Sequence, residues 1–425
     1  MHREGINRFT RARNRPYGQM RNTDRTTAMY ILDSISADSM FSATLTQSSG
    51  LETLANAALQ RGINAYTNKD YALAAKEFKR SVGIGRNSSF AADAAQYLAM
   101  SYLQLEDTDN AVKAYQTAYQ IDPYRDDIHL KLGNLYFSQE KYEDARTEYA
   151  EAVRLNPSTV NRYSLGQAYL ELGRYADAEN QYSEIQRLAP EQAGGYLGMG
   201  LTLSRQGRYE DAITQFEEAV SRDADLYDAH AQMGYAYADM GDMENAQKRV
   251  DYLESVEQPE VADTLSRYMY KVDPPKMVFA QSSSSFAFSL GKGTPLVVLN
   301  SYLMNANASK TFTMTIQFDK AMDRGSVENP ANWLISRTTG QGPGQAYNFG
   351  LRIPSTEARI KTIPDAVTWD ADNMTATVYF KVAQNADANA TIDPSHIEFK
   401  FSGKDIYGLK MNPKFDQFSG FSKVY

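Results

Sequence analysis

Few residues in this chain could carry out chemistry, and they are widely separated. The 425 residues include four histidines and no cysteine, so thiol chemistry, disulfide bonds and thiolate metal sites are excluded. A hydrolytic triad needs a histidine beside a nucleophile and an acid, but no Gly-x-Ser-x-Gly motif occurs and His396 stands alone among strand-like residues. His129 and His230 each lie four residues before a glycine, Gly133 or Gly234, which indicates a repeated packing position. We therefore predict a protein that is not an enzyme and holds no cofactor.

The remaining candidates for ligand binding are loops rich in glycine or aspartate. Segment 340–344 lies between polar loop residues, and segment 291–294 lacks the glycine spacing of a phosphate-binding loop, so neither predicts a phosphate site. Asp370, Asp372 and Asn373 could offer oxygen ligands to Ca²⁺. The same composition is typical of a hairpin turn, so calcium at this turn is a weak hypothesis.

The elements that would position any site follow a repeat of about 34 residues. An aromatic residue follows each repeated alanine after four residues, except after the last, where Val250 takes its place. A Leu-Gly or Met-Gly pair precedes most of these alanines, and several units end at a proline. A fixed period of this length predicts a solenoid of helix pairs. The repeated alanines are Ala111, Ala145, Ala178, Ala212 and Ala246.

This pattern resembles the tetratricopeptide repeat (TPR) family. The resemblance implies two packed helices in each unit, with Gly133 and its equivalents allowing close approach and Pro157 ending a unit. Six units fit residues 55–256, and Pro259–Val272 has the helical spacing of a capping helix. We therefore assign residues 51–272 to the solenoid and expect a binding protein.

The first helix of each unit is expected to line the inner face of the solenoid. Chaperone-binding members of the family clamp a terminal carboxylate with Lys, Arg and Asn, but here only Asn134 matches. The uncharged lining suits an amphipathic helix or an extended apolar segment instead. The predicted lining residues are Gln96, Met100, Leu103, Leu130, Asn134, Phe137, Tyr163, Gln167, Leu170, Leu197, Leu201 and Tyr235.

Residues 1–50 form a predicted basic arm. Its first 25 residues hold seven arginines against Glu4 and Asp24, whereas the whole chain has a net charge of −8. Such an arm can dock on another copy or on an anionic membrane; with few aromatic residues for stacking, we expect no nucleic acid partner. Met29, Leu32 and Ile35 lie on one face of an expected short amphipathic helix.

The apolar period changes to two beyond residue 294. Thr311–Phe318, Thr375–Val382 and Ile397–Phe401 alternate apolar with polar residues, which predicts half-buried strands, and Leu296–Leu299 is expected to be a fully buried strand. We predict a β-sandwich over residues 294–413, joined to the solenoid by a serine-rich linker at 273–293.

Three segments of this region resemble the bacterial Ig-like domains of surface-layer and other cell-surface proteins. Ile316–Asn329 resembles the opening motif, Trp369–Val378 the central hairpin and Lys404–Gly408 the closing turn. The long insert Arg337–Thr362 departs from the family pattern. The resemblance implies an all-β Ig-like domain, so the whole chain is expected to be an α+β multidomain protein with an all-α solenoid first.

The C-terminal tail, residues 414–425, carries aromatic residues without an evident core role: Phe415, Phe418, Phe421 and Tyr425. If this tail or the Met29–Ile35 segment docks into a neighbouring copy, the contact is head-to-tail and can propagate.

We therefore favour a self-assembling structural subunit of a bacterial cell-surface or extracellular filament or layer. One alternative is a monomeric adaptor that binds an apolar or helical segment of a partner, such as another surface protein. A second is a carbohydrate- or calcium-binding surface module. No apolar run is long enough for a membrane span and no secretory signal is visible, which leaves a cytoplasmic location as the alternative to the cell surface.

Overall fold

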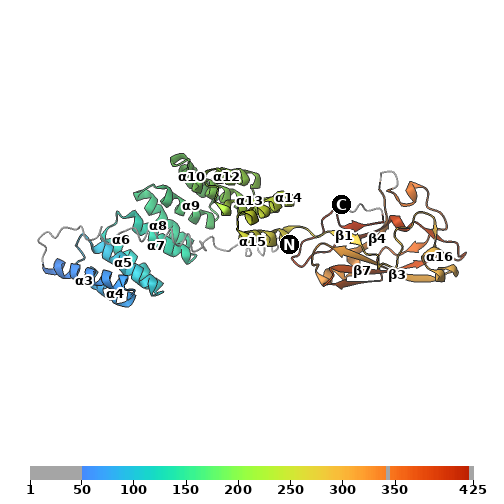
Figure 1. The fold of residues 1–425 in the computed structure, drawn as a ribbon, viewed down its shortest axis with the longest axis horizontal. Helices are drawn as coiled ribbons and strands as arrows, with labels where there is room; N and C mark the ends of the chain where they lie inside the picture. The colour runs from blue at the N-terminus through green and yellow to red at the C-terminus, as the bar shows by residue number, and fades with distance from the viewer. Residues whose placement is uncertain (1–49, 341–344, 421–425) are drawn as a thin grey trace, which may run out of the picture. The chain divides into compact units, whose positions relative to one another are not determined.

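The computed structural model describes residues 50–340 and 345–420 (Figure 1). They divide into two compact units. The first runs to Ala236 and takes in Ser255–Gln258, and the second comprises Tyr237–Glu254 and the chain from Pro259 onward. Met29, Leu32, Ile35, Phe421 and Tyr425 lie outside the described residues.

Helices follow one another through the first unit, joined by short turns. In every pair from α5 to α14, the turn between the first and second helix contains one residue with positive φ: Glu106, Glu140, Gly173, Gly207 or Gly241. A left-handed residue ends a helix and reverses the chain, so the repeat is visible in the backbone. The helices of the first unit are α3 (Gly50–Thr67), α4 (Tyr71–Ile84), α5 (Ala91–Gln104), α6 (Thr108–Ile121), α7 (Asp126–Ser138), α8 (Tyr142–Leu155), α9 (Thr159–Glu171), α10 (Tyr175–Leu188), α11 (Ala193–Arg205) and α12 (Tyr209–Arg222). Helix α13 (Tyr227–Asp239) begins in the first unit, and α14 (Met243–Ser255) and α15 (Pro259–Val272) belong almost wholly to the second.

The repeated alanine, glycine and aromatic positions pack as the sequence predicts. Ala145 and Ala178 are fully buried. A Cβ atom added at Gly133 would lie 2.6 Å from the Tyr149 ring, and one added at Gly166 would lie 2.7 Å from the Tyr182 ring. Because no side chain fits there, glycine is what lets the aromatic ring of the second helix lie on the backbone of the first.

The second unit contains a region rich in antiparallel strands. One sheet has the order β1-β3-β7-β5, with β6 also paired to β7; another has the order β10-β9-β4; β2 pairs with β8. The strands are β1 (Met277–Ala280), β2 (Thr294–Pro295), β3 (Ser309–Phe318), β4 (Trp333–Arg337), β5 (Arg359–Ile360), β6 (Ala366–Asp370), β7 (Thr375–Ala383), β8 (Thr391–Ile392), β9 (Ile397–Phe401) and β10 (Gln417–Phe418). The predicted alternation places one face of β3, β7 and β9 in a single aromatic-rich core, where Phe380 of β7 contacts Phe399 of β9 at a ring separation of 5.2 Å.

Local expectations for Leu296–Leu299, for the linker and for the tail differ from the structure. Leu296–Leu299 forms a short helix, α16, in which only Leu296 is buried, because the turn follows Pro295 and exposes Val297 and Val298. The predicted linker contributes β1, which pairs with β3, and its Ser285 side chain accepts a hydrogen bond from Thr313 N at 2.8 Å. Serines assigned to the linker therefore form hydrogen bonds with strand β3.

The expected tail also has a core role. Phe418 lies in β10, is 7 % exposed and packs edge-to-face on Phe288 at 5.6 Å, while Phe415 is half-buried. The pairing of β10 with β9 draws these aromatics into the domain.

A buried lysine connects α15 to the strands within the second unit. Lys320 Nζ donates to Tyr270 O at 2.6 Å and to Asp273 O at 2.7 Å. Tyr270 Oη in turn accepts from Ala321 N. Since the carbonyls at a helix C-terminus lack partners within the helix, the lysine satisfies them and attaches the helix to the strand region.

Candidate protein-binding face

The first helices of the repeats present a mixed face of apolar side chains and amides. Of the twelve predicted lining residues, Asn134 is exposed, whereas Gln96, Leu170 and Leu201 are buried. Those three pack within the solenoid, so they are not free to contact a partner. The others are half-buried and keep part of their surface in solvent: Met100, Leu103, Leu130, Phe137, Tyr163, Gln167, Leu197 and Tyr235.

Two equivalent tyrosines lie in successive repeats beside this face, and one of them contacts its Asn134 amide. Tyr149 Oη donates to Asn134 Oδ1 at 2.7 Å, which fixes the amide and leaves its NH₂ group as a donor. Tyr182 occupies the equivalent position one repeat later, next to Gly166, and its buried hydroxyl has no hydrogen-bond partner among the described residues. Burial raises the pKa of both tyrosines, so both hydroxyls remain protonated donors.

A charged cluster that was not predicted from the sequence lies at the α5 and α7 end of the face. Arg125 donates to Asp93 at 2.9 Å, to Asp127 at 2.7 Å and to Gln96 at 3.1 Å, which explains why Gln96 is buried. Lys131 Nζ donates to Asp127 at 3.3 Å. Asp93 and Asp127 are one 34-residue period apart, and this recurrence is the signal that could have revealed the cluster.

Hydrogen bonds and burial have opposite effects within this cluster. Burial alone would raise the pKa of Asp127, but the hydrogen bonds from Arg125 and the charge of Lys131 lower it. Hydrogen bonding to Asp127 raises the pKa of Arg125, whereas burial lowers the pKa of Lys131. The cluster is therefore internally paired, and it ties the turn before α7 to α5.

Three ranges of the helical part match two known repeat families. Residues 130–193 match the family described as "Tetratricopeptide repeat", and residues 100–139 and 202–241 match "TPR repeat". The chain contains tetratricopeptide repeats. These are families of repeats that serve as protein-binding scaffolds, and no catalytic family is among them.

Individual relatives share only part of the chain. Hsp70-Hsp90 organizing protein 1 of Arabidopsis thaliana is 28% identical over 100 residues, which cover 24% of this chain and 16% of that protein. A TPR protein from Parabacteroides merdae ATCC 43184 is 15% identical, with a TM-score of 0.44, over 52% of this chain and 91% of its own. YrrB, a TPR protein with an unusual peptide-binding site, is 20% identical, with a TM-score of 0.37, over 46% of this chain and 100% of its own.

The TPR histidines are packing residues. His129 Nδ1 lies 2.7 Å from Glu148 Oε2, and its ring stacks on Tyr119 at 5.2 Å. His230, at the same repeat position, is 5 % exposed. Across the residues that the structure describes, no group of three metal-ligating side chains is found, and none of the helices is long and apolar enough to cross a membrane.

The weak calcium candidates form a self-contained turn between β6 and β7. Asp370 Oδ1 accepts from Asp372 N at 3.1 Å and from Asn373 N at 3.2 Å, and Asn373 Nδ2 donates to Asp370 Oδ2 at 2.8 Å. The Asp370 carboxylate is thus engaged in closing the hairpin.

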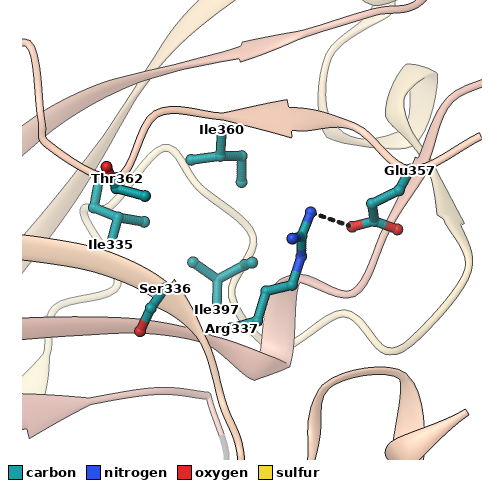
Figure 2. A pocket seen from close by; sticks show the side chains of 7 residues that line it. All are labelled: Ile335, Ser336, Arg337, Glu357, Ile360, Thr362 and Ile397. Atoms are coloured by element: carbon teal, nitrogen blue, oxygen red, sulfur yellow. Dashed lines mark ion pairs between the residues drawn. The ribbon is translucent and has the colours of Figure 1, made fainter. Parts of the chain in front are cut away.

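A small cavity lies in the strand region of the second unit, between β4, β5 and the start of β9 (Figure 2). Its volume is about 250 Å³, and it is lined by Ile335, Ser336, Arg337, Glu357, Ile360, Thr362 and Ile397. Four of these residues belong to the insert Arg337–Thr362, whose sequence departs from the Ig-like pattern: Arg337, Glu357, Ile360 and Thr362.

Proposed function

We propose that the TPR solenoid holds an extended or helical apolar segment of a partner protein against the face formed by its first helices. The observation that carries the proposal is the alternation of half-buried Leu130, Phe137 and Leu197 with the amides of Asn134 and Gln167. Apolar side chains can accept the partner's side chains, while amides can pair with its main chain.

The charges of this face favour an uncharged segment. The charged side chains of the cluster pair with one another: Arg125 with Asp93 and Asp127, and Lys131 with Asp127. The cluster therefore has no unpaired positive or negative charge to attract an acidic or a basic tail. An apolar segment contacts this face without breaking those pairs, whereas a charged one would have to compete with them.

A second copy of the chain is one candidate for the partner. The Met29–Ile35 segment has the spacing of an apolar helix face, and the seven arginines before it suit the acidic remainder of the chain. Such docking would give the head-to-tail assembly, at a cell surface or outside the cell, that the sequence analysis favoured. Phe418 is buried in its own domain, so we favour the Met29–Ile35 segment over the C-terminal tail as the connector.

Site-specific photo-crosslinking tests the proposal. A photoreactive residue at position 137 replaces Phe137 on the face, and the control replaces Leu188, which is 46 % exposed near the end of α10. We expect adducts from position 137 and none from position 188. Adducts of twice the chain mass indicate self-assembly, and adducts with another protein indicate an adaptor. Equal labelling from both positions, or none from position 137, would contradict the proposal.

A further inference from the structure

The cavity of the strand region has apolar walls and a charged end. Ile335 and Ile397 are 3 % exposed, and Ile360 is half-buried opposite them. Figure 2 shows the Arg337 side chain directed across the cavity toward Glu357. Ile335 N donates to Thr362 O at 2.7 Å, which holds β4 against the segment after β5 beside the cavity.

The Arg337 guanidinium is only loosely partnered. Its Nη2 lies 3.8 Å from Glu357 Oε1, which is too long for a hydrogen bond. The Arg337 side chain is 44 % exposed, and its guanidinium lies 5.2 Å from the centre of the Tyr347 ring. A guanidinium has five N–H donors in a planar fork that fits a carboxylate, so this group retains the capacity to bind one.

Glu357 is held by a hydrogen bond from a residue other than Arg337. Its carboxylate accepts a hydrogen bond from Tyr347 Oη, and its side chain is 10 % exposed. Asp393, whose charge also acts on Glu357, is buried and lies 2.8 Å from His396 Nδ1. Among the placed residues, Arg337 from β4, Tyr347 and Asp393 are thus the titratable or charged groups shown to act on Glu357.

We propose that this cavity binds a carboxylate carried on a short aliphatic group, with the Arg337 guanidinium holding the carboxylate and the three isoleucines enclosing the aliphatic part. The volume of about 250 Å³ suits a small ligand, because it lies just below the roughly 300–1,000 Å³ of most ligand pockets. A free small carboxylic acid and the apolar C-terminal residue of a polypeptide both have this chemistry.

Glu357 makes the binding dependent on pH. Burial raises the pKa of this carboxyl to about 7, with the Arg337 charge opposing the shift and the Asp393 charge adding to it. Above that pH the Glu357 carboxylate competes for Arg337 and repels the ligand; below it the neutral carboxyl does neither. Affinity is therefore expected to rise as the pH falls, while the ligand itself stays ionised.

Titration calorimetry on the full chain tests the proposal with two probes. The probes are 4-methylpentanoate and an acetylated Ala-Ala-Leu peptide with a free C-terminus, each compared with its neutral amide. Arg337→Gln should weaken binding by about tenfold or more, whereas Arg352→Gln, an exposed arginine of the same insert, should leave it unchanged. Glu357→Gln should abolish the rise in affinity from about pH 8 to about pH 6.

Each result distinguishes the alternatives. Binding by only one probe identifies the source of the carboxylate, and binding by both supports the shared chemistry. Melting temperatures of the two arginine variants confirm that both are folded. If neither probe binds, if the amides bind as well as the acids, or if the two arginine variants lose equal affinity, the assignment is overturned.

Discussion

Lys320 Nζ lies 2.9 Å from Asp405 Oδ2, and both side chains are buried, at 3 % and 0 % exposure. The same ammonium donates to two carbonyls at the end of α15. This lysine therefore links helix α15 to the strand region of the second unit.

Replacing Lys320 by Met should destabilise the second unit by about 3 kcal/mol, because the Asp405 charge stays buried without its partner. Lys276→Met is the matched control, since its pair with Asp273 is partly exposed and is expected to contribute less than about 1 kcal/mol. Urea unfolding followed by tryptophan fluorescence measures both, because both tryptophans, Trp333 and Trp369, lie in this unit. Equal effects of the two substitutions would contradict the role given to Lys320.

Two Gly→Ala substitutions should change the stability of the solenoid in opposite directions. A Cβ at Gly200 would lie 2.5 Å from the Phe216 ring, so Gly200→Ala should cost about 1–3 kcal/mol through overpacking. A Cβ at Gly83, inside α4, would meet none of the described atoms within 4 Å, so Gly83→Ala should stabilise by about 0.5–1 kcal/mol. Denaturation followed by far-ultraviolet circular dichroism measures the change in unfolding free energy for both variants. A stabilising effect of Gly200→Ala would contradict the close packing of Phe216 on Gly200.

The repeat was predictable because each unit repeats the same local requirement. Each unit needs a glycine where the aromatic ring of its second helix lies on the backbone of its first helix, as Gly166 and Tyr182 show. The spacing of the two residues therefore recurs in the sequence. The period of two in Thr375–Val382 likewise predicted a strand, because β7 lies in the middle of its sheet with one face in the core.

The features that were not predicted depend on contacts that occur once in the fold and join residues far apart in the sequence. In the sequence Phe418 cannot be distinguished from the other tail aromatics, and only the pairing of β10 with β9 shows that it is buried. Glu357 and Arg337 are 20 residues apart in an insert with no repeated spacing, and only the fold brings their side chains together. The Ig-like resemblance rests on turns, so it carried no information about the cavity between the strands.

The equivalent tyrosines Tyr149 and Tyr182 should respond differently to loss of the hydroxyl. Tyr149→Phe removes the 2.7 Å hydrogen bond to Asn134 and should cost about 1 kcal/mol. Tyr182→Phe removes a buried hydroxyl without a partner among the described residues, so it should be neutral or slightly stabilising. Thermal unfolding of the two variants, measured side by side, provides the comparison. A larger loss for Tyr182→Phe than for Tyr149→Phe would contradict the absence of a partner for the Tyr182 hydroxyl.

The stability of the second unit should fall as the pH rises through the titration of Glu357. Burial raises the pKa of Glu357 to about 7 in the folded protein, above its ordinary value in the unfolded chain. The folded state therefore binds more protons than the unfolded state in this interval, and its advantage is complete below the unfolded pKa and lost as the pH passes 7. We expect a loss of about 1–2 kcal/mol between about pH 4.5 and pH 7, after allowance for solvent screening.

Glu357→Gln isolates this contribution, because the amide oxygen can still accept from Tyr347 while the titration is removed. Urea unfolding at several pH values, followed by tryptophan fluorescence, should show a flatter pH dependence in Glu357→Gln than in the parent chain. Glu398→Gln is the control: burial also raises the pKa of that carboxyl, but Ser336 and Lys400 oppose the shift, so its effect on the slope should be smaller. Parallel curves for the parent and Glu357→Gln would show that Glu357 titrates at its ordinary pKa, and would remove the basis for pH-dependent binding in the adjoining cavity.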